Sequence, residues 1–575
     1  MKNKFFLGIG MVLLLSACSQ NNKNFGDCIS QTAIDRVDSM PNLPGTYEML
    51  NWKQKAVDYD KFLFDWNNNS KVGPLIWLDN SRRNIDQPTF GLYTAIHDIR
   101  QGKSANNGEF HESLNSMSAV LGAGLVGIDK TNQDGYNYVK MIQNYFNSDS
   151  GWNIMMNNTY STVAKLGGGY GRDWWYDVFP NALYYAICDV FPHVDGANRI
   201  QKSIAEQFLK CDSVLNGNYN YSYFDYGRMK GMVDNIPLQQ DAAGGQAYVL
   251  LCAYHKFGDP RYLKHSESAI EALLSQKESR FYEVLMPLGV YTAAYLNAVE
   301  HKNYDVKKLL NWVFNGCQSP TGRTGWGIIV GKWGKYDVDG LQGSITDGGG
   351  YAFLMNSIKP IWPFLPLVKY QPQFARAIGK WILNDASACR LFYPGNIDIK
   401  NQWLPQLREL TNNNIAYEGL RKKDDYGKSS LKGVSPVAIG DGPKWIKGNP
   451  IETMFSVYSS SPVGILGSVI KKTNVKGILQ LNCNVTDFYA DRPYPVYLYY
   501  NPYMVDKSIT YNTDQACDLF DIVNKEYVAK NIKSTATFNM PADEARIIVQ
   551  LPTGTQLSYK NGRIIANNQF IISYY

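Results

Sequence analysis

The sequence predicts a mainly α protein in which helical hairpins follow one another in series, with an antiparallel β-sandwich at the C-terminal end. Three observations support this fold class. A clear helical hairpin covers residues 239–276. Similar hairpins recur roughly every fifty residues before residue 420, a spacing typical of repeat architectures. After residue 450 the apolar segments become short, β-branched and separated by turns.

The hairpin over 239–276 shows both the helical period and the signals that end each helix. Apolar residues recur at helical spacing in each half, so each half presents one apolar stripe that needs a neighbour. Between the halves, Gly258, Asp259 and Pro260 supply a C′ glycine, an N-cap carboxylate and a proline at N1. Gly244 and Gly245 each cost about 1 kcal/mol of helix stability relative to alanine, which indicates a group close to the backbone there.

The other hairpins are predicted from the same period. Long connections rich in Gly, Asp, Tyr and Trp join several of them at one end, which favours a closed toroid with a floor over an open solenoid. The first two helical patterns cover residues 51–66 and 87–100. The helical pairs cover 110–126 with 135–146, 178–191 with 197–212, 282–300 with 305–314, and 351–360 with 372–388.

Length and composition indicate a folded protein of two domains, with 575 residues, 45% hydrophobic and 19% charged. The net charge of +6 is far from the footprint of a nucleic-acid-binding protein, so no nucleic-acid partner is predicted. The nine cysteines show no CxxC spacing and the six histidines show no metal-ligand spacing. We therefore predict neither a metal centre nor a cofactor.

The N-terminus predicts export. Two lysines precede an apolar run that is too short to span a membrane, which is typical of a secretory signal. The ending Leu15-Ser16-Ala17-Cys18 resembles a bacterial lipobox. This resemblance implies a signal peptide over 1–17, a lipid on Cys18, and an envelope lipoprotein of the outer membrane or periplasm. The polar residues 18–45 are predicted to be a tether.

The remaining boundaries follow from shifts in composition. The helical toroid is predicted over 46–420, a charged, Gly/Pro-rich linker over 421–450, and the β-sandwich over 451–575. Strands are predicted at 455–458, 464–470, 477–481, 496–500 and 545–551, and Asn561-Gly562 indicates a type I′ hairpin turn.

The hairpin series and its long loops resemble the (α/α) toroid enzymes that act on carbohydrates, over roughly residues 50–420. That group includes the six-hairpin glycosidases and the toroid polysaccharide lyases, several of which also carry a β-domain after the toroid. The resemblance implies an enzyme that cleaves glycosidic bonds of a polysaccharide or oligosaccharide.

Acidic residues recur at the predicted starts of the inner helices, beside Gly and aromatic residues. Hydrolysis of a glycosidic bond needs one carboxylic acid and one carboxylate, so these acids are the candidates for catalysis. The alternative for each is a helix cap or first-turn acid favoured by the helix dipole. The predicted catalytic residues are Asp173, Asp241, Glu283 and Asp347, and the predicted substrate-binding residues are Arg172, Trp174, Trp175, Tyr176, Asp177, Gln240, Tyr282, Trp326 and Trp333.

Two other functions remain open. The segment 172–180 is similar to the Asn-Trp-Trp stretch of the chondroitin AC and hyaluronate lyases, which implies β-elimination on a uronate-containing glycan. In this chain Asp173 stands where those lyases have asparagine, and Asp241 follows Gln240 where they have Gln-His. A surface lipoprotein that binds glycans without turnover is the non-catalytic alternative. Asp337, Asp339 and Asp347 are also a possible Ca²⁺ set.

Overall fold

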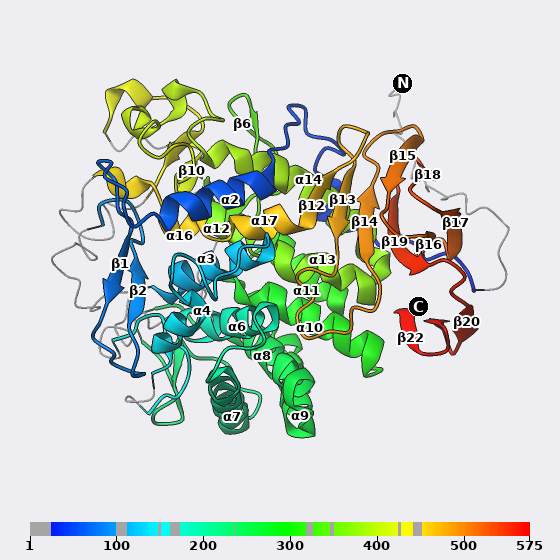
Figure 1. The fold of residues 1–575 in the computed structure, drawn as a ribbon, viewed down its shortest axis with the longest axis horizontal. Helices are drawn as coiled ribbons and strands as arrows, with labels where there is room; N and C mark the ends of the chain where they lie inside the picture. Colours follow the sequence, from blue (N-terminus) through cyan, green and yellow to red (C-terminus); the bar gives the residue numbers. More distant parts are fainter. Residues whose placement is uncertain are drawn as a thin grey trace, which may run out of the picture.

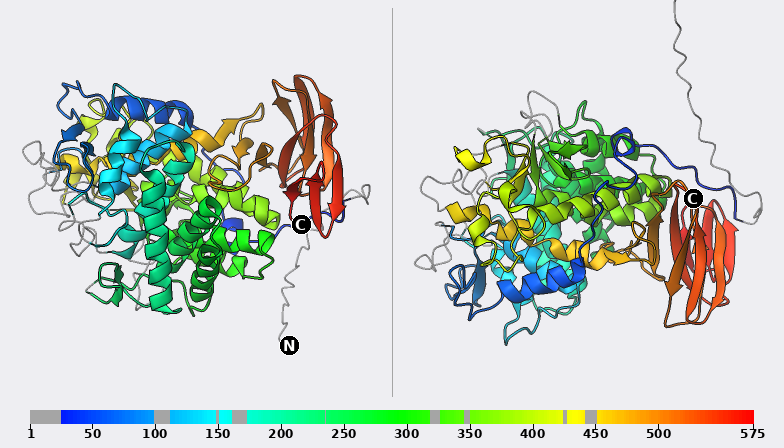
Figure 2. Two further views of the ribbon diagram at one scale, coloured as in Figure 1. Left: turned by 60° about the horizontal axis from the view of Figure 1, so that its bottom comes forward. Right: turned by 90° about the horizontal axis from the view of Figure 1, so that it is seen from above.

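The computed structural model of the 575-residue chain describes residues 25–98, 112–147, 151–160, 173–234, 236–317, 326–344, 350–423, 427–440 and 451–575. A helical body carries a β-domain at one side (Figures 1 and 2). Within the described ranges, no helix combines the length and the apolar character needed to cross a membrane.

Six helical positions form an inner ring in the described part of the chain. Each inner helix contacts the next, and the last one contacts the first, so the ring is closed. The inner helices are buried on nearly all sides, as expected for elements surrounded by other helices. In order they are α3 (Ser113–Leu125), α6 (Trp174–Val190), α8 (Ala242–Phe257), α10 (Leu285–Val299), α12 (Leu354–Ile358) with α13 (Ile361–Tyr370), and α16 (Val457–Ser460) with α17 (Val463–Val469).

An outer layer of amphipathic helices covers the ring, and most of its helices bury one stripe against the inner helices. This layer holds α2 (Trp52–Leu63), α4 (Tyr138–Met141) with η3 (Ile142–Tyr145), α7 (Ala197–Leu215), α9 (Pro260–Leu274), α11 (Val306–Asn315) and α14 (Ala375–Cys389). The toroid predicted from the hairpin series is therefore confirmed. The predicted hairpin over 239–276 is α8 and α9, joined through Gly258 at φ +68°.

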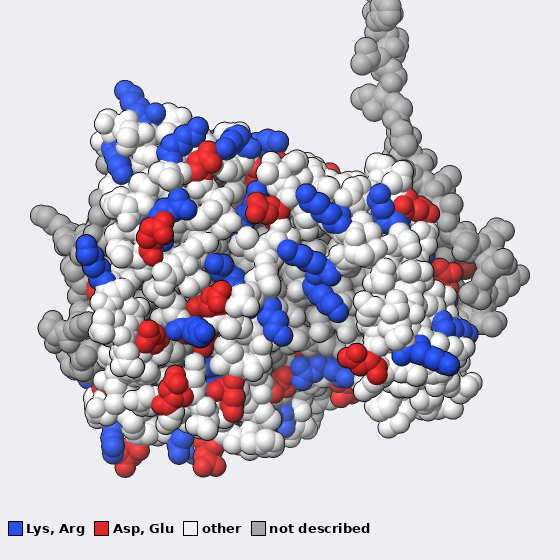
Figure 3. All heavy atoms as spheres, turned by 45° about the horizontal axis from the view of Figure 1, so that its top comes forward, with Lys and Arg blue, Asp and Glu red and all other residues white. Residues whose placement is uncertain are grey.

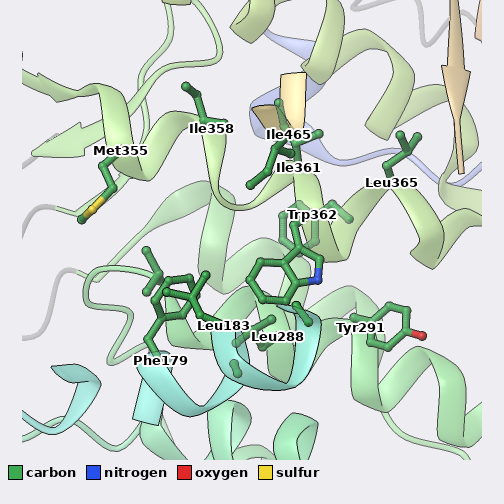
Figure 4. Packing of buried hydrophobic residues seen from close by; sticks show 14 of the residues in the cluster. Phe179, Leu183, Leu288, Tyr291, Met355, Ile358, Ile361, Trp362, Leu365 and Ile465 are labelled. Atoms are coloured by element: carbon green, nitrogen blue, oxygen red, sulfur yellow. The ribbon is translucent and has the colours of Figure 1, made fainter. Parts of the chain in front are cut away.

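Glycine pairs bring neighbouring inner helices into close contact. A Cβ built on Gly289 of α10 would lie 2.7 Å from the Cα of Gly244 in α8. A Cβ on Gly464 of α17 would lie 2.1 Å from the backbone oxygen of Gly122 in α3. No side chain fits at either crossing. The backbone neighbour expected at Gly244 is thus the adjacent inner helix. Deeper in the ring, Trp362 packs against Phe179 with ring centroids 5.9 Å apart (Figure 4).

Short sheets lie around the ring. The largest has the order β11-β10-β9-β8-β5, and its strand β9 leads directly into the inner helix α12. Its strands are β5 (Trp326–Ile328), β8 (Gln342–Ser344), β9 (Tyr351–Phe353), β10 (Gly419–Arg421) and β11 (Val437–Ile439). The antiparallel pairs are β1 (Ile76–Asp79) with β2 (Thr89–Leu92), β3 (Tyr223–Asp225) with β4 (Lys230–Met232), and β6 (Lys332–Trp333) with β7 (Tyr336–Asp337).

The C-terminal domain is built from antiparallel sheets, which agrees with the predicted β-sandwich. A separate core between its layers includes Ile509, Leu519 and Phe538. The six-stranded sheet has the order β12 (Ile470–Lys472), β13 (Leu479–Asn482), β14 (Val496–Tyr500), β19 (Ala545–Pro552), β16 (Cys517–Asp521) and β17 (Glu526–Ile532). The smaller sheets are β15 (Lys507–Asn512) with β18 (Thr535–Met540), and β20 (Leu557–Lys560), β21 (Arg563–Ala566) and β22 (Phe570–Ser573).

The loop between β13 and β14 closes one end of the ring. Asp487 in this loop is fully buried, and its carboxylate accepts hydrogen bonds from the hydroxyls of Tyr291 and Tyr370 and from Nζ of Lys369. Phe488 packs edge-on against Trp362 at 5.3 Å between ring centroids. Tyr370 is the last residue of α13, so the loop between β13 and β14 lies at the end where the inner helices finish.

Several predictions about single segments were wrong. The helix expected over 87–100 is replaced at Thr89–Leu92 by β2, where Gly91 lies directly beneath the Trp77 ring. The strands expected at 455–458 and 464–470 are replaced mainly by α16 and α17, because short apolar runs do not distinguish a buried helix from a strand. The ring thus extends beyond the predicted boundary at 450. The predicted linker contains β11, which pairs with β10.

The predicted tether is also bound to the body of the protein from residue 25 onward. Val37 lies in the short helix α1 (Asp35–Asp38), and Ile34 directly precedes this helix. Both residues are fully buried. The backbone amide of Ile29 donates to Val523 in the β-domain, and that of Thr32 donates to Gln373 at the ring. The mostly polar composition of the segment gave no indication that Ile34 and Val37 would be buried. By contrast, the predicted type I′ turn is confirmed, with φ of +52° at Asn561 and +76° at Gly562.

Candidate active site

Acidic residues stand at the starts of four inner helices, all at one end of the ring. Glu112, Asp173 and Asp241 occupy the N-cap positions of α3, α6 and α8, and Glu283 directly precedes the N-cap of α10. All four are buried. At the three N-cap positions the side chain makes no capping hydrogen bond to its own helix. We call this end, defined by these four acids, the acidic end.

Asp173 is held by the segment that leads into the next inner helix. Its Oδ1 accepts a hydrogen bond of 2.8 Å from Nε2 of Gln239. The other amide atom of the same residue, Oε1, accepts a bond of 3.1 Å from the backbone amide of Trp175. Gln239 therefore links the start of α6 to the start of α8, and it orients Asp173 by a side-chain contact that no capping pattern predicts.

Asp241 is fully buried one helix further around the ring. Its Oδ2 accepts a hydrogen bond of 3.1 Å from the backbone amide of Tyr282, and within the described residues its Oδ1 has no hydrogen-bond partner. Burial raises the pKa of Asp241 well above its ordinary value, and the nearby Glu283 adds to this rise. Asp241 is thus set up to carry a proton at a pH where an exposed aspartate is ionised.

Glu283 lies next to Asp241 but in a different environment. Its backbone takes a left-handed conformation at φ +61°, which is uncommon for a residue with a side chain and is typical of functional positions. Asn356 of α12 donates a 2.7 Å hydrogen bond to Oε2, and Gln342 of β8 donates a 2.9 Å bond to the backbone oxygen. A donor aimed at the carboxylate stabilises its negative charge.

A buried lysine lies below these acids. Lys359 follows Asn356 by three residues along the chain, and its Nζ lies 4.4 Å from the centre of the Phe179 ring. Within the described residues this Nζ makes no hydrogen bond. Burial lowers the pKa of Lys359 to about 7, against the opposing charges of Glu283 and Glu112. The acidic end therefore contains a cation that can change its charge near neutral pH.

Tyrosines and one further acid form a wall beside the same end. The hydroxyl of Tyr351 donates a 2.6 Å hydrogen bond to Glu418, and the guanidinium of Arg421 lies 4.2 Å from the Tyr351 ring centre. Tyr458 stands at the start of the last inner helix. Burial, and then the charges of Glu418 and other acids including Glu112 and Glu283, raise the pKa of Tyr458 well above its ordinary value.

The aromatic residues predicted to bind sugar differ in how far they are buried. Trp174, predicted to offer a face to sugar, is fully buried and stacks on Tyr219 at 5.6 Å, so it presents no exposed face. Trp175 is also buried, although it stacks at 4.0 Å on the half-buried Tyr176. Large aromatic residues at a helix start supplied core here, since the ring closes tightly around them.

The half-buried Trp326 of β5 remains a candidate sugar contact. Its ring meets Tyr282 edge-on at 5.9 Å and Phe353 at 6.0 Å, and Tyr282 directly precedes Glu283 in the chain. Trp333 instead lies buried in the hairpin of β6 and β7, where no described contact joins it to the four acids.

The remaining predicted residues divide into two groups. Asp177 is fully buried in α6, and Gln240 is half-buried between Gln239 and Asp241. Cys18, Arg172 and Asp347 lie outside the described residues. Asp337 accepts a hydrogen bond from the Thr46 amide and pairs with Lys332, while Asp339 accepts one from the Gly331 amide. Among the described residues no three His, Cys, Asp or Glu side chains gather as a metal site would require.

Sequence reasoning missed several residues of this end. Glu112 directly precedes an inner helix, so the rule that selected Asp173 and Asp241 would have found it in the segment FHESLNSM. Lys359 is a lone lysine in the apolar segment SIKPIWPFLPL, which was a usable signal. Asn356 and Glu418 carried none, because their positions depend on how distant segments pack.

Comparisons with known proteins give structural likeness only. No family model matches the chain, and no curated protein matches it either. Among solved structures it is similar to a GH127 β-L-arabinofuranosidase from Geobacillus stearothermophilus T6, with 10% identity, 91% of this chain and 85% of that chain covered, and a TM-score of 0.38. It is also similar to an unsaturated glucuronyl hydrolase from Streptococcus agalactiae, with 12% identity, 77% and 98% covered, and a TM-score of 0.33. At these TM-scores the fold class rests on the helix contacts and sheets described above.

Proposed function

We propose that this protein is a glycoside hydrolase whose two catalytic carboxyl groups lie at the acidic end. The observation that carries the proposal is the contrast between two neighbouring acids. Asp241 is buried, with its pKa raised, while Glu283 accepts a hydrogen bond from Asn356. A protonated acid beside a stabilised carboxylate is the pairing that acid/base cleavage of a glycosidic bond requires.

In this mechanism Asp241 is the general acid and Glu283 the general base. Asp241 protonates the leaving glycosidic oxygen, which lets that bond break as positive charge develops on the sugar ring. Glu283 removes a proton from the water that attacks the anomeric carbon. Tyr176 and Trp326, both half-buried, supply apolar faces for the sugar. Asp173, fixed by Gln239, binds a hydroxyl of the same unit.

A lyase acting on a uronate-containing glycan is the second candidate. The specific observation in its favour is Arg421, which lies over Tyr351 at 4.2 Å from the ring centre. An arginine beside a tyrosine supplies a cation for a uronate carboxylate and a hydroxyl for proton abstraction. Against it, the Tyr351 hydroxyl donates to Glu418, and the ionised carboxylates at the acidic end would repel a uronate.

Product analysis tests the proposal. The purified protein is incubated with 4-nitrophenyl glycosides of several sugars, with neutral oligosaccharides, and with an acidic polyuronate. New reducing ends without ultraviolet absorbance support hydrolysis. Absorbance of an unsaturated uronate at the new end supports the lyase. Retention of the glycan in a pull-down, with neither product, supports a non-catalytic binder and contradicts both enzymes.

We further propose that the protein is an exported lipoprotein anchored to the bacterial envelope through Cys18. The lipobox-like segment that ends at Cys18 supports this. In a bacterial host, the full-length chain should incorporate labelled palmitate and fractionate with membranes. A Cys18→Ser variant that still incorporated the label would contradict the anchor.

A further inference from the structure

A cavity lies beside the acidic end, outside the four acids. It has a volume of about 320 Å³ and lies between the segment that follows α7 and the segment that follows α9. Outer helices run antiparallel to inner ones in a hairpin series, so these two helices finish at the end where α6, α8 and α10 begin. The volume falls at the lower end of the roughly 300–1,000 Å³ typical of small-molecule sites.

The walls of this cavity are rich in amides. Asn218, Asn220, Gln240 and Gln276 all line it. Nε2 of Gln240 donates to Asn220 at 2.8 Å, and Nε2 of Gln276 donates to the backbone oxygen of Gln240 at 3.0 Å. The Oε1 atoms of Gln240 and Gln276 are both buried and have no hydrogen-bond partner within the described residues. Each of these glutamines therefore keeps an acceptor that no described residue uses, and a ligand with hydroxyl donors would satisfy it once the side chain turns toward the cavity.

The charges of the cavity largely offset one another, with Lys277 and Arg280 against Glu278. Arg280 lines it but forms an ion pair with Glu278, which lines it too. An anionic ligand would meet this carboxylate, and a cationic one would meet Lys277 and Arg280. A compact neutral molecule with several hydroxyl groups matches the amides, and it needs neither charge to be compensated.

Some residues that line the cavity are chain neighbours of residues in the candidate active site. Gln240 lies between Gln239, which holds Asp173, and Asp241. Tyr219 lines the cavity and stacks on Trp174, the residue after Asp173. A ligand in the cavity would therefore contact Gln240, the chain neighbour of both Gln239 and Asp241, and Tyr219, which stacks on Trp174.

We propose that this cavity is a distal saccharide subsite, which binds a neutral sugar unit of the glycan chain beyond the unit cleaved at the acidic end. The inference deepens the proposed hydrolase function and rests on it for the kinetic part of its test. Such a subsite makes affinity depend on chain length, because only a substrate of several units can occupy the cavity and the acidic end together.

Kinetics of two variants test this subsite. Gln276→Leu removes an acceptor, and Asn218→Ala removes an amide from the opposite wall. The control is Lys264→Ala, an exposed residue of α9 away from the cavity. On a nitrophenyl monoglycoside all three should match the wild type. On an oligosaccharide of four or more units, KM should rise about tenfold in the two cavity variants, the effect of losing one or two net hydrogen bonds, with kcat nearly unchanged. Equal KM values for wild type and both variants on the long substrate would overturn the subsite.

A binding assay separates failure of the subsite from failure of the hydrolase. The same proteins are run in native gels that contain either neutral xylan or acidic polygalacturonate. If the protein cleaves nothing but is retarded by the neutral polymer, and the cavity variants are not, the subsite stands and the hydrolase does not. If the wild type and both cavity variants migrate alike in every gel, and circular dichroism shows that the variants are folded, the subsite is overturned.

Discussion

Acids at the starts of the outer helices and acids at the starts of the inner helices occupy the same local position but behave in opposite ways. Asp259 and Asp305 begin α9 and α11, and their side chains accept the capping hydrogen bonds from Arg261 and Lys308 amides. Asp173 and Asp241 begin α6 and α8, and neither caps its helix. The outer pair stabilises helix ends. The inner pair is free of that role.

The pKa values show the same contrast. Hydrogen bonds from Arg261 lower the pKa of Asp259, whereas burial raises the pKa of Asp241. A buried carboxyl group that does not cap its helix and has a raised pKa costs stability, so its presence indicates a function. On the face shown in Figure 3, Lys and Arg side chains are interspersed with Asp and Glu.

The largest expected effect is at Glu283. Glu283→Gln removes the general base but keeps an acceptor for Asn356, so hydrolysis should fall at least a thousandfold while the midpoint of thermal unfolding stays within a few degrees of the wild type. Initial rates on the glycoside identified by the product assay measure this. Asp305→Asn is the matched control at an outer helix and should keep full activity. Activity of Glu283→Gln within tenfold of the wild type would remove it from the mechanism.

Asp241→Asn should lower kcat by about a hundredfold to a thousandfold and abolish the alkaline limb of the pH profile, because the amide cannot donate the proton. The same substitution should increase the stability of the folded state relative to the wild type as pH rises. The folded-state pKa of Asp241 is raised, so the wild type loses stability as pH rises above the unfolded pKa, and the variant does not. Thermal unfolding from pH 4 to 7 should show the variant gaining on the wild type. A variant that lost ground over this range would contradict the buried, protonated state.

Lys359 provides a test that needs no substrate. Its folded pKa is about 7 and its unfolded pKa is near the ordinary 10.5, so the unfolded chain binds one more proton in that window. Stability from this group should therefore rise as pH increases from 7 toward 10.5. Lys359→Met should abolish that rise and be more stable than the wild type at pH 7, whereas Lys264→Met should leave the pH dependence intact. A parallel pH dependence in Lys359→Met and wild type would show that the lysine is not desolvated.

The smallest effect is expected at the outer caps. Asp305→Ala removes the acceptor for the Lys308 amide and should cost about 1 kcal/mol, a lowering of the unfolding midpoint by about 2 °C, with no change in kcat. Differential scanning calorimetry and rate assays measure the two quantities. A loss of activity without a loss of stability would reverse the assignment of the outer acids.

The sequence predicted the elements with strong periodicity and failed where long-range packing decides. The hairpin of α8 and α9 followed from its stripes and from the Gly-Asp-Pro turn. In contrast, α16 and α17 complete the ring through packing between distant segments, such as the contact of Gly464 with Gly122, and no local pattern encodes that contact. For the site, the rule of acids before inner helices selected Asp173, Asp241 and Glu283, which the structure brings to one end of the ring. It could not show that Gln239 would hold Asp173, or that Asn356 would hold Glu283.

The most direct test of the inner and outer contrast measures kcat and the free energy of unfolding together for Asp241→Asn and Asp305→Ala. We predict opposite results: Asp241→Asn loses nearly all activity and keeps or gains stability, while Asp305→Ala keeps activity and loses about 1 kcal/mol. If both variants kept full activity, or if both lost stability alike, the inner acids would be ordinary helix-end residues and the proposed active site would be contradicted.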